Sequence, residues 1–114
     1  MSSPHFLDNE MFALLREDRI KEFNERMEAG ETPPNLNGAN LRGCDLRGLK
    51  TDGMDLGNAY LRGADLRGLD LRNTNLEGAS IRKTQLSGTF FPDVLSSQEI
   101  LMSQELGTRL RYDT

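Results

Sequence analysis

The sequence predicts a mainly β protein in which a short repeat winds into stacked coils with flat sides. Leucine recurs at every fifth position over residues 61–76, a period that fits neither an α-helix nor a β-strand. The position two residues before each of these leucines is small or apolar, and the position two residues after it is usually glycine or asparagine. Two inward side chains and one bend in every five residues describe one side of a coil. Because a lone coil cannot bury its inner face, such repeats stack and stabilise one another.

The composition sets limits on this fold. The chain has 114 residues, of which 36 % are hydrophobic and 28 % charged, and it contains no tryptophan. This is enough for one domain but lean for a globular packing of helices and sheets. No apolar run is long enough to cross a bilayer, and the start MSSPHFLDNE lacks the features of a signal peptide. We therefore expect a cytoplasmic protein with no membrane partner.

The N-terminal segment, residues 1–35, is predicted to form an amphipathic helical cap. Its pattern predicts one or two helices within 8–29, with a break at Glu17-Asp18. The apolar residues at helical spacing are Met11, Leu14, Leu15, Ile20, Phe23 and Met27. Gly30 and the two prolines that follow stop the pattern. Because a short stack has two open ends, we expect these helices to cover one of them.

The repeat segment, residues 36–93, holds twelve consecutive five-residue units without an insertion. Only one unit has a polar residue at its centre. The centres are Leu36, Leu41, Leu46, Thr51, Leu56, Leu61, Leu66, Leu71, Leu76, Ile81, Leu86 and Phe91. This column of large apolar side chains is predicted to be the core of the stack.

Two stretches of the segment, GANLRGCDLRG at 38–48 and GADLRGLDLRN at 63–73, resemble the pentapeptide-repeat family, whose pattern is A(D/N)LXX. The resemblance implies a short right-handed quadrilateral β-helix with four units per coil. Twelve units then make about three coils, roughly 15 Å tall at the spacing of stacked strands. The stretch LKTDGMDLGN at 49–58 departs from the pattern, with larger inward residues and Thr51 at a centre. Two outcomes are open: the second coil bulges there, or the larger inward residues compensate in volume for the smaller centre.

Residues 94–114 are predicted to form a C-terminal capping helix and a tail. Ser96 followed three residues later by Glu99 is a capping box, which marks the start of a helix. Gly107 fits the end of that helix. No structure is assigned to the tail at 108–114.

Charge is distributed unevenly along the chain. Residues 1–35 hold eight acidic and four basic side chains, a net charge of −4. Residues 36–91 hold six acidic and eight basic side chains, a net charge of +2, and residues 92–114 hold four and two, a net charge of −2. The repeat segment is therefore mildly basic between two acidic ends.

Stacked arginines form the candidate docking face. The twenty-residue coil implied by the resemblance places five arginines on two adjacent sides: Arg42, Arg62 and Arg82 on one, Arg47 and Arg67 on the next. The interpretation that we favour is a solvated surface on which Asp45 and Asp65 pair with these arginines. The second interpretation is a docking strip for an acidic surface or an anionic polymer, since planar guanidinium groups suit bidentate contacts.

Reactive side chains are few. With one cysteine and one histidine, the chain is expected to form no internal disulfide and to hold no metal. Cys44 stands at an inward position equivalent to alanine, and His5 is expected to be a solvated residue near the terminus. The aspartates that precede the unit centres belong to the family motif; they are Asp45, Asp55, Asp65 and Asp70. We therefore predict no enzyme activity, no catalytic residues and no cofactor.

The preferred hypothesis is a non-catalytic protein–protein interaction module, or scaffold, whose protein partner is not identified. A homodimer through an incompletely covered end of the stack is left open. The alternative is nucleic-acid or anion binding through the stacked arginines, although the segment lacks the interleaved aromatic residues and the large basic surplus that nucleic-acid binding favours. Pentapeptide-repeat proteins that mimic DNA and act on gyrase are long, strongly acidic and dimeric, so that role is the least favoured here.

Overall fold

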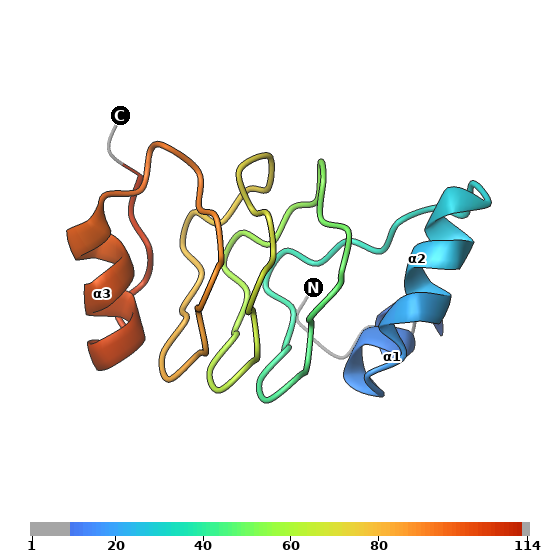
Figure 1. Ribbon diagram of the computed structural model, residues 1–114, viewed down its shortest axis with the longest axis horizontal. Helices are drawn as coiled ribbons and strands as arrows, with labels where there is room; N and C mark the ends of the chain where they lie inside the picture. Colours follow the sequence, from blue (N-terminus) through green and yellow to red (C-terminus); the bar gives the residue numbers. More distant parts are fainter. Residues whose placement is uncertain (1–9, 113–114) are drawn as a thin grey trace.

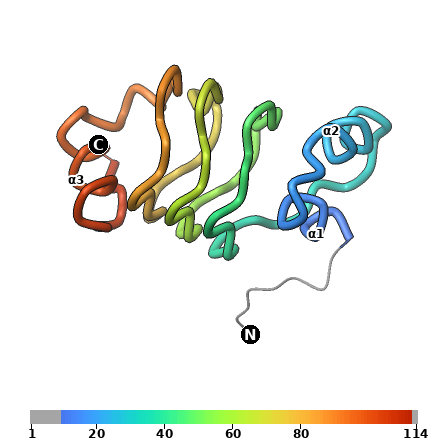
Figure 2. Tube along the Cα trace, turned by 60° about the horizontal axis from the view of Figure 1, so that its bottom comes forward, coloured from blue at the N-terminus to red at the C-terminus, as the bar shows by residue number. Residues whose placement is uncertain are grey.

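The computed structural model describes residues 10–112 and consists of a stack of coils between helical ends (Figure 1). The helices are α1 (Glu10–Arg16), α2 (Ile20–Glu28) and α3 (Ser97–Leu106). Helices α1 and α2 lie at one end of the stack and α3 at the other, and the second view separates the coils along the same axis (Figure 2). None of the helices in the described part of the chain is long and apolar enough to cross a membrane.

The predicted fold class, a mainly β protein forming a right-handed quadrilateral β-helix, is wrong. The described residues contain three α-helices and no β-strand, and the repeats are joined only by isolated parallel bridges. The reason is local. Each unit spends about two of its five residues in a turn, and in most units one of these has a positive φ, for example 71° at Gly43 and 73° at Gly63. The extended stretch between two turns is therefore too short to become a strand.

Residues twenty apart lie above one another in the stack. Parallel bridges join Asn40 to Tyr60 and Tyr60 to Ser80. The backbone supports this register, since the N–H of Leu41 donates to the Tyr60 carbonyl at 2.9 Å and the N–H of Leu61 donates to the Ser80 carbonyl at 2.9 Å. Four five-residue units therefore make each coil, and side chains at equivalent positions form columns along the stack.

The core of the stack is the column of unit centres. Leu41, Leu61 and Ile81 lie above one another, and all three are completely buried. Cys44 occupies an inward position next to this column and is also buried. Because burial of one leucine-sized side chain contributes about 1.5–3 kcal/mol, this column is the main source of stability in the repeat segment.

The regular bridge pattern between the first and second coils is interrupted beside Thr51, within the stretch 49–58 that departs from the repeat. Asp70 bridges Phe90, but no bridge joins Lys50 to Asp70 in the described residues. The buried hydroxyl of Thr51 donates instead to the Asp70 carbonyl at 2.8 Å, and the hydroxyl of Thr74 donates to the Thr51 carbonyl at 3.0 Å. Side-chain hydroxyls thus take over part of the hydrogen bonding between coils at this position.

Helices α1 and α2 hydrogen-bond the exposed edge of the first coil. The break between them lies at Asp18, with φ 61°, as the sequence predicts, and its carboxylate accepts the N–H of Asp45 at 3.0 Å. Arg16 donates to the Arg42 carbonyl at 2.9 Å. The amide of Asn24 donates to one backbone carbonyl and accepts one backbone N–H of the same coil. The predicted helical residues 8–9 lie outside the described residues.

Helix α3 and the tail cover the last coil. The predicted helix start and end are confirmed: Ser96 Oγ accepts the N–H of Glu99 at 3.1 Å, and Gly107 ends the helix in the left-handed region. The Glu99 carboxylate accepts the N–H of Arg111 at 2.9 Å, so the described residues show only the Ser96 half of the capping box. Ser103 Oγ accepts a backbone N–H from the coil. The tail continues over the same end, since the N–H of Leu110 donates to the coil and the hydroxyl of Tyr112 accepts a backbone N–H. Residues 113–114 lie outside the described part.

Candidate docking face

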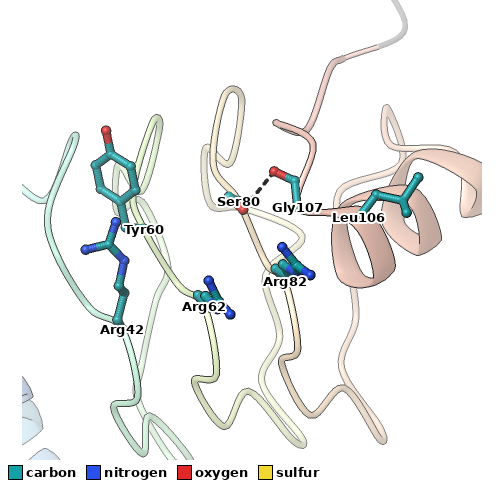
Figure 3. A pocket seen from close by; sticks show the side chains of 7 residues that line it. All are labelled: Arg42, Tyr60, Arg62, Ser80, Arg82, Leu106 and Gly107. Atoms are coloured by element: carbon teal, nitrogen blue, oxygen red, sulfur yellow. Dashed lines mark hydrogen bonds between the residues drawn. The ribbon is translucent and has the colours of Figure 1, made fainter.

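The twenty-residue register places Arg42, Arg62 and Arg82 side by side on one side of the stack. We call these three residues the arginine ladder (Figure 3). Their backbone is fixed directly: the N–H of Gly43 donates to the Arg62 carbonyl at 2.9 Å, and the N–H of Gly63 donates to the Arg82 carbonyl at 2.9 Å. The spacing of the ladder is therefore the spacing of the coils, about 4.8 Å.

The other two predicted site residues, Arg47 and Arg67, are engaged in ion pairs. Arg67 donates two parallel hydrogen bonds to the Asp65 carboxylate, at 2.9 and 2.7 Å, and Arg47 does the same to Asp45 at the same distances. Arg47 also lies 3.3 Å from an oxygen of Asp65. Two arginines and two aspartates thus form a network without net charge. Such bidentate pairs are the strongest form of surface ion pair.

The aspartates of this network are strongly stabilised as carboxylates. Hydrogen bonding from the Arg67 guanidinium lowers the pKa of Asp65 to about 2. Hydrogen bonding from Arg47 likewise lowers the pKa of Asp45. Asp65 is the more enclosed of the two, with 8 % of its surface exposed, because both arginines lie against it. These carboxylates are therefore committed to their own pairs and leave no charge to neutralise the ladder.

The arginine ladder has no carboxylate partner among residues 10–112. The sequence explains the difference. The paired arginines have an aspartate two residues earlier, whereas the ladder arginines have Asn40, Tyr60 and Ser80 at that position. The structure thus divides the five predicted site residues into a neutralised pair and an unpaired ladder.

Arg82 is the most constrained residue of the ladder. Its Nε is buried and has no hydrogen-bond partner in the described residues. Gly107 packs against its stem so closely that a Cβ at Gly107 would come within 3.0 Å of Arg82 Cδ. Beside it, Leu106 is 66 % exposed although it is a large apolar residue. The C-terminal end of the ladder therefore combines an unsatisfied guanidinium with an apolar surface.

Tyr60 holds the other end of the ladder in place. The guanidinium of Arg42 lies over its ring, 4.8 Å from the centroid, and that of Arg109 lies 5.5 Å away. Arg109 is anchored by a 2.8 Å hydrogen bond to the Gly78 carbonyl. The sequence did not indicate this residue, because the tail that contains it shows no periodic pattern. Arg109 has no carboxylate partner in the described part of the chain either, so it adds to the positive charge around Tyr60.

The arginine ladder lines an open groove of about 500 Å³. Its lining is Arg42, Tyr60, Arg62, Ser80, Arg82, Leu106 and Gly107 (Figure 3). The hydroxyl of Ser80 donates to the Gly107 carbonyl at 3.3 Å, and no histidine or carboxylate lines the groove beside it. The groove offers guanidinium donors, an aromatic ring and one apolar edge, which suits a surface carrying carboxylates or phosphates.

The remaining predicted residues take structural positions. Burial raises the pKa of the Cys44 thiol, which accepts a hydrogen bond from Arg16 at 3.1 Å, so the thiol stays protonated in the core at neutral pH. Asp55 accepts hydrogen bonds from Asn75 and from a backbone N–H. Among residues 10–112 no three His, Cys, Asp or Glu side chains are grouped to hold a metal ion. His5 lies outside the described residues.

Comparison with known proteins agrees with the repeat pattern. The family model for pentapeptide repeats matches eight copies, at residues 34–49 and 55–91. The unmatched residues between these two ranges include Thr51, where the regular hydrogen bonding between coils changes. Neither the curated proteins nor the solved structures include a match to the chain. The eight matched copies show that the chain belongs to the pentapeptide-repeat family.

Proposed function

We propose that this pentapeptide-repeat chain is a non-catalytic protein-binding module that docks an acidic partner surface on the arginine ladder. Pentapeptide repeats are typical of protein-interaction modules. The observation that carries the proposal is the contrast between two neighbouring rows of arginines, of which one is neutralised by its own aspartates and the other is not.

The energetics favour an acidic partner. Three like charges about 4.8 Å apart repel one another, and no carboxylate of the described residues relieves this repulsion. A carboxylate from a partner would do so and would gain charge-assisted hydrogen bonds. Because the hydrogen bonds between coils already fix the backbone of the ladder, binding orders little of the chain, which reduces its entropic cost.

Co-purification from the source cells at low salt tests this function. The ladder variant Arg42→Gln/Arg62→Gln/Arg82→Gln is compared with the control Arg47→Gln/Arg67→Gln, which makes the same chemical change on the neighbouring row. We expect a protein partner to be retained by the wild type and the control and lost from the ladder variant. Circular dichroism establishes that both variants are folded. A partner that the folded ladder variant retains would contradict the proposed docking face.

Nucleic-acid binding is the second candidate, because unpaired arginines beside Tyr60 also suit a phosphate backbone. It predicts affinity for duplex DNA or RNA at low salt that falls steeply as salt rises. Gel-shift measurements on the same two variants distinguish the candidates. Salt-sensitive binding that only the ladder variant loses, together with no protein partner, would replace protein binding by nucleic-acid binding.

A further inference from the structure

We propose that the partner segment seated on the ladder is an α-helix that presents one acidic side chain per turn and an apolar side chain in the following turn. This inference rests on the proposed function, since it names the chemistry of the surface that docks. It follows from the spacing of the ladder, the lack of carboxylates beside it and the exposed leucine at its end.

The spacing of the arginines favours a helix over an extended chain. Stacked coils set the ladder residues about 4.8 Å apart, so the three arginines span about 9.6 Å. A helix repeats one face every 5.4 Å, so three acidic residues on that face span about 10.8 Å. An extended chain repeats one face about every 6.7 Å and spans about 13.4 Å over the same three residues. The helix therefore misses the ladder by about 1 Å and the extended chain by about 4 Å.

The rigidity of the ladder makes this difference matter. The backbone carbonyls of Arg62 and Arg82 accept hydrogen bonds from the preceding coil, and Arg42 is held by stacking on Tyr60. Arginine side chains can absorb a mismatch of about 1 Å by changing rotamer, whereas a mismatch of about 4 Å displaces one of the three contacts. An acidic helix lying along the stack can therefore contact all three arginines at once.

Arg82 supplies an independent reason for a ligand. Its buried Nε has no acceptor in the described residues, and an unsatisfied buried N–H is unfavourable. A partner carboxylate that takes the guanidinium in a bidentate contact would draw it outward and supply the missing acceptor. Arg62, on the adjacent coil, would donate to a second carboxylate, so that the two contacts align the partner along the stack.

Leu106 explains the apolar residue of the proposed partner. It lines the same groove as the ladder, at the end next to Arg82, and 66 % of its surface is exposed. A helix whose acidic residues follow the ladder reaches this leucine one turn beyond its last acidic contact. An apolar side chain there would bury Leu106, and so would set the register of the partner on the ladder.

Synthetic peptides test the inference directly. The probe is an alanine-based 20-residue helical peptide with glutamate at three positions on one face, each one turn apart, and leucine one turn further along. A second peptide has the same composition with the glutamates distributed around the helix, and a third carries the glutamates in a proline-rich chain that cannot form a helix. Binding of each is measured by fluorescence anisotropy at low salt, on the full chain.

We expect the one-face peptide to bind at least about tenfold more tightly than either of the others, since about one charge-assisted contact is lost in each. Arg62→Gln and Arg82→Gln should each weaken binding of this peptide by about tenfold, and the control Arg67→Gln by less than about twofold. Replacing the leucine of the peptide by alanine should weaken binding several-fold, as expected for one apolar contact.

Three results of the peptide experiment would overturn the inference. These are equal binding of the three peptides, tighter binding of the proline-rich peptide, and absence of binding altogether. If the cellular partner still depends on the ladder, the proposed function stands and only the helical partner is wrong; if it does not, both fail. Self-association that depends on the ladder, measured by sedimentation in the absence of peptide, would identify a second copy as the occupant and overturn the inference too.

Discussion

The residue two positions before each stacked arginine decides whether that arginine is neutralised. Asp65 accepts the backbone N–H of Arg67 at 3.1 Å with the same carboxylate that receives the guanidinium, so the short loop holds the pair together. Asn40 accepts the N–H of Arg42 at 3.2 Å in the same way, but its amide brings no charge. The sequence led us to expect that Asp45 and Asp65 would pair with the stacked arginines. In the structure they pair with Arg47 and Arg67, which follow them by two residues, and not with the ladder.

The paired aspartates predict a loss of stability in acid. Arg67 lowers the pKa of Asp65 to about 2 in the folded chain, whereas an unfolded aspartate has a pKa of about 3.9. The folded state therefore holds this carboxylate ionised more strongly than the unfolded state does. The stabilisation is fully present above about pH 4 and is lost as pH falls from about 4 to 2. Asp70, whose pKa Arg72 lowers to about 2, acts in the same window.

Urea unfolding between pH 7 and pH 2.5 measures this effect. Asp65→Asn should lower the stability near neutral pH and flatten its decline between about pH 4 and 2. Arg67→Gln should flatten the decline as well, because it removes the cause of the pKa shift. An Asp65→Asn variant whose stability falls as steeply as that of the wild type would show that this pair does not govern acid unfolding.

At the level of elements, the sequence predicts the features that follow from a periodic pattern, namely the helices and the repeat units. It does not predict the contacts that individual side chains make. The helical pattern and the capping box give the two helical ends, including the break at Asp18 and the end at Gly107. The packing of the tail on the last coil was not predictable, because Leu110 and Tyr112 are the only apolar residues after Gly107 and two residues are too few to define a pattern. The β-helix expectation fails because recurrent turns leave only single bridge residues.

The N-terminal cap can be tested with one residue of α2. Phe23 is completely buried in the core, whereas Lys21 on the same helix is exposed. Phe23→Asp should destabilise the chain by at least about 3–5 kcal/mol, the cost of removing a buried phenylalanine, and should reduce solubility by exposing the first coil. Lys21→Asp, the matched control, should change stability by less than about 0.5 kcal/mol. Thermal unfolding of both variants provides the measurement, and equal melting temperatures would refute the cap.

At the level of the whole molecule, the distribution of charge and the rigidity of the stack both favour the arginine ladder as the docking face. The repeat segment has a net charge of +2 between acidic ends, and the pairing of Arg47 and Arg67 concentrates the unpaired charge on the ladder. Helices cover both ends of the stack, so the groove along the ladder is a fixed surface on a rigid scaffold. The sequence predicted the columns of arginines, but only the structure separates the unpaired column from the paired one.

The most direct test of the ladder is an amide NMR titration with the one-face acidic peptide. Gly43 and Gly63 follow ladder arginines, and Gly48 and Gly68 follow the paired arginines in equivalent turns, so the chain contains its own controls. The account predicts saturable shifts of the Gly43 and Gly63 signals with much smaller changes at Gly48 and Gly68. Shifts centred on Gly48 and Gly68, or on α1 and α2, would contradict it.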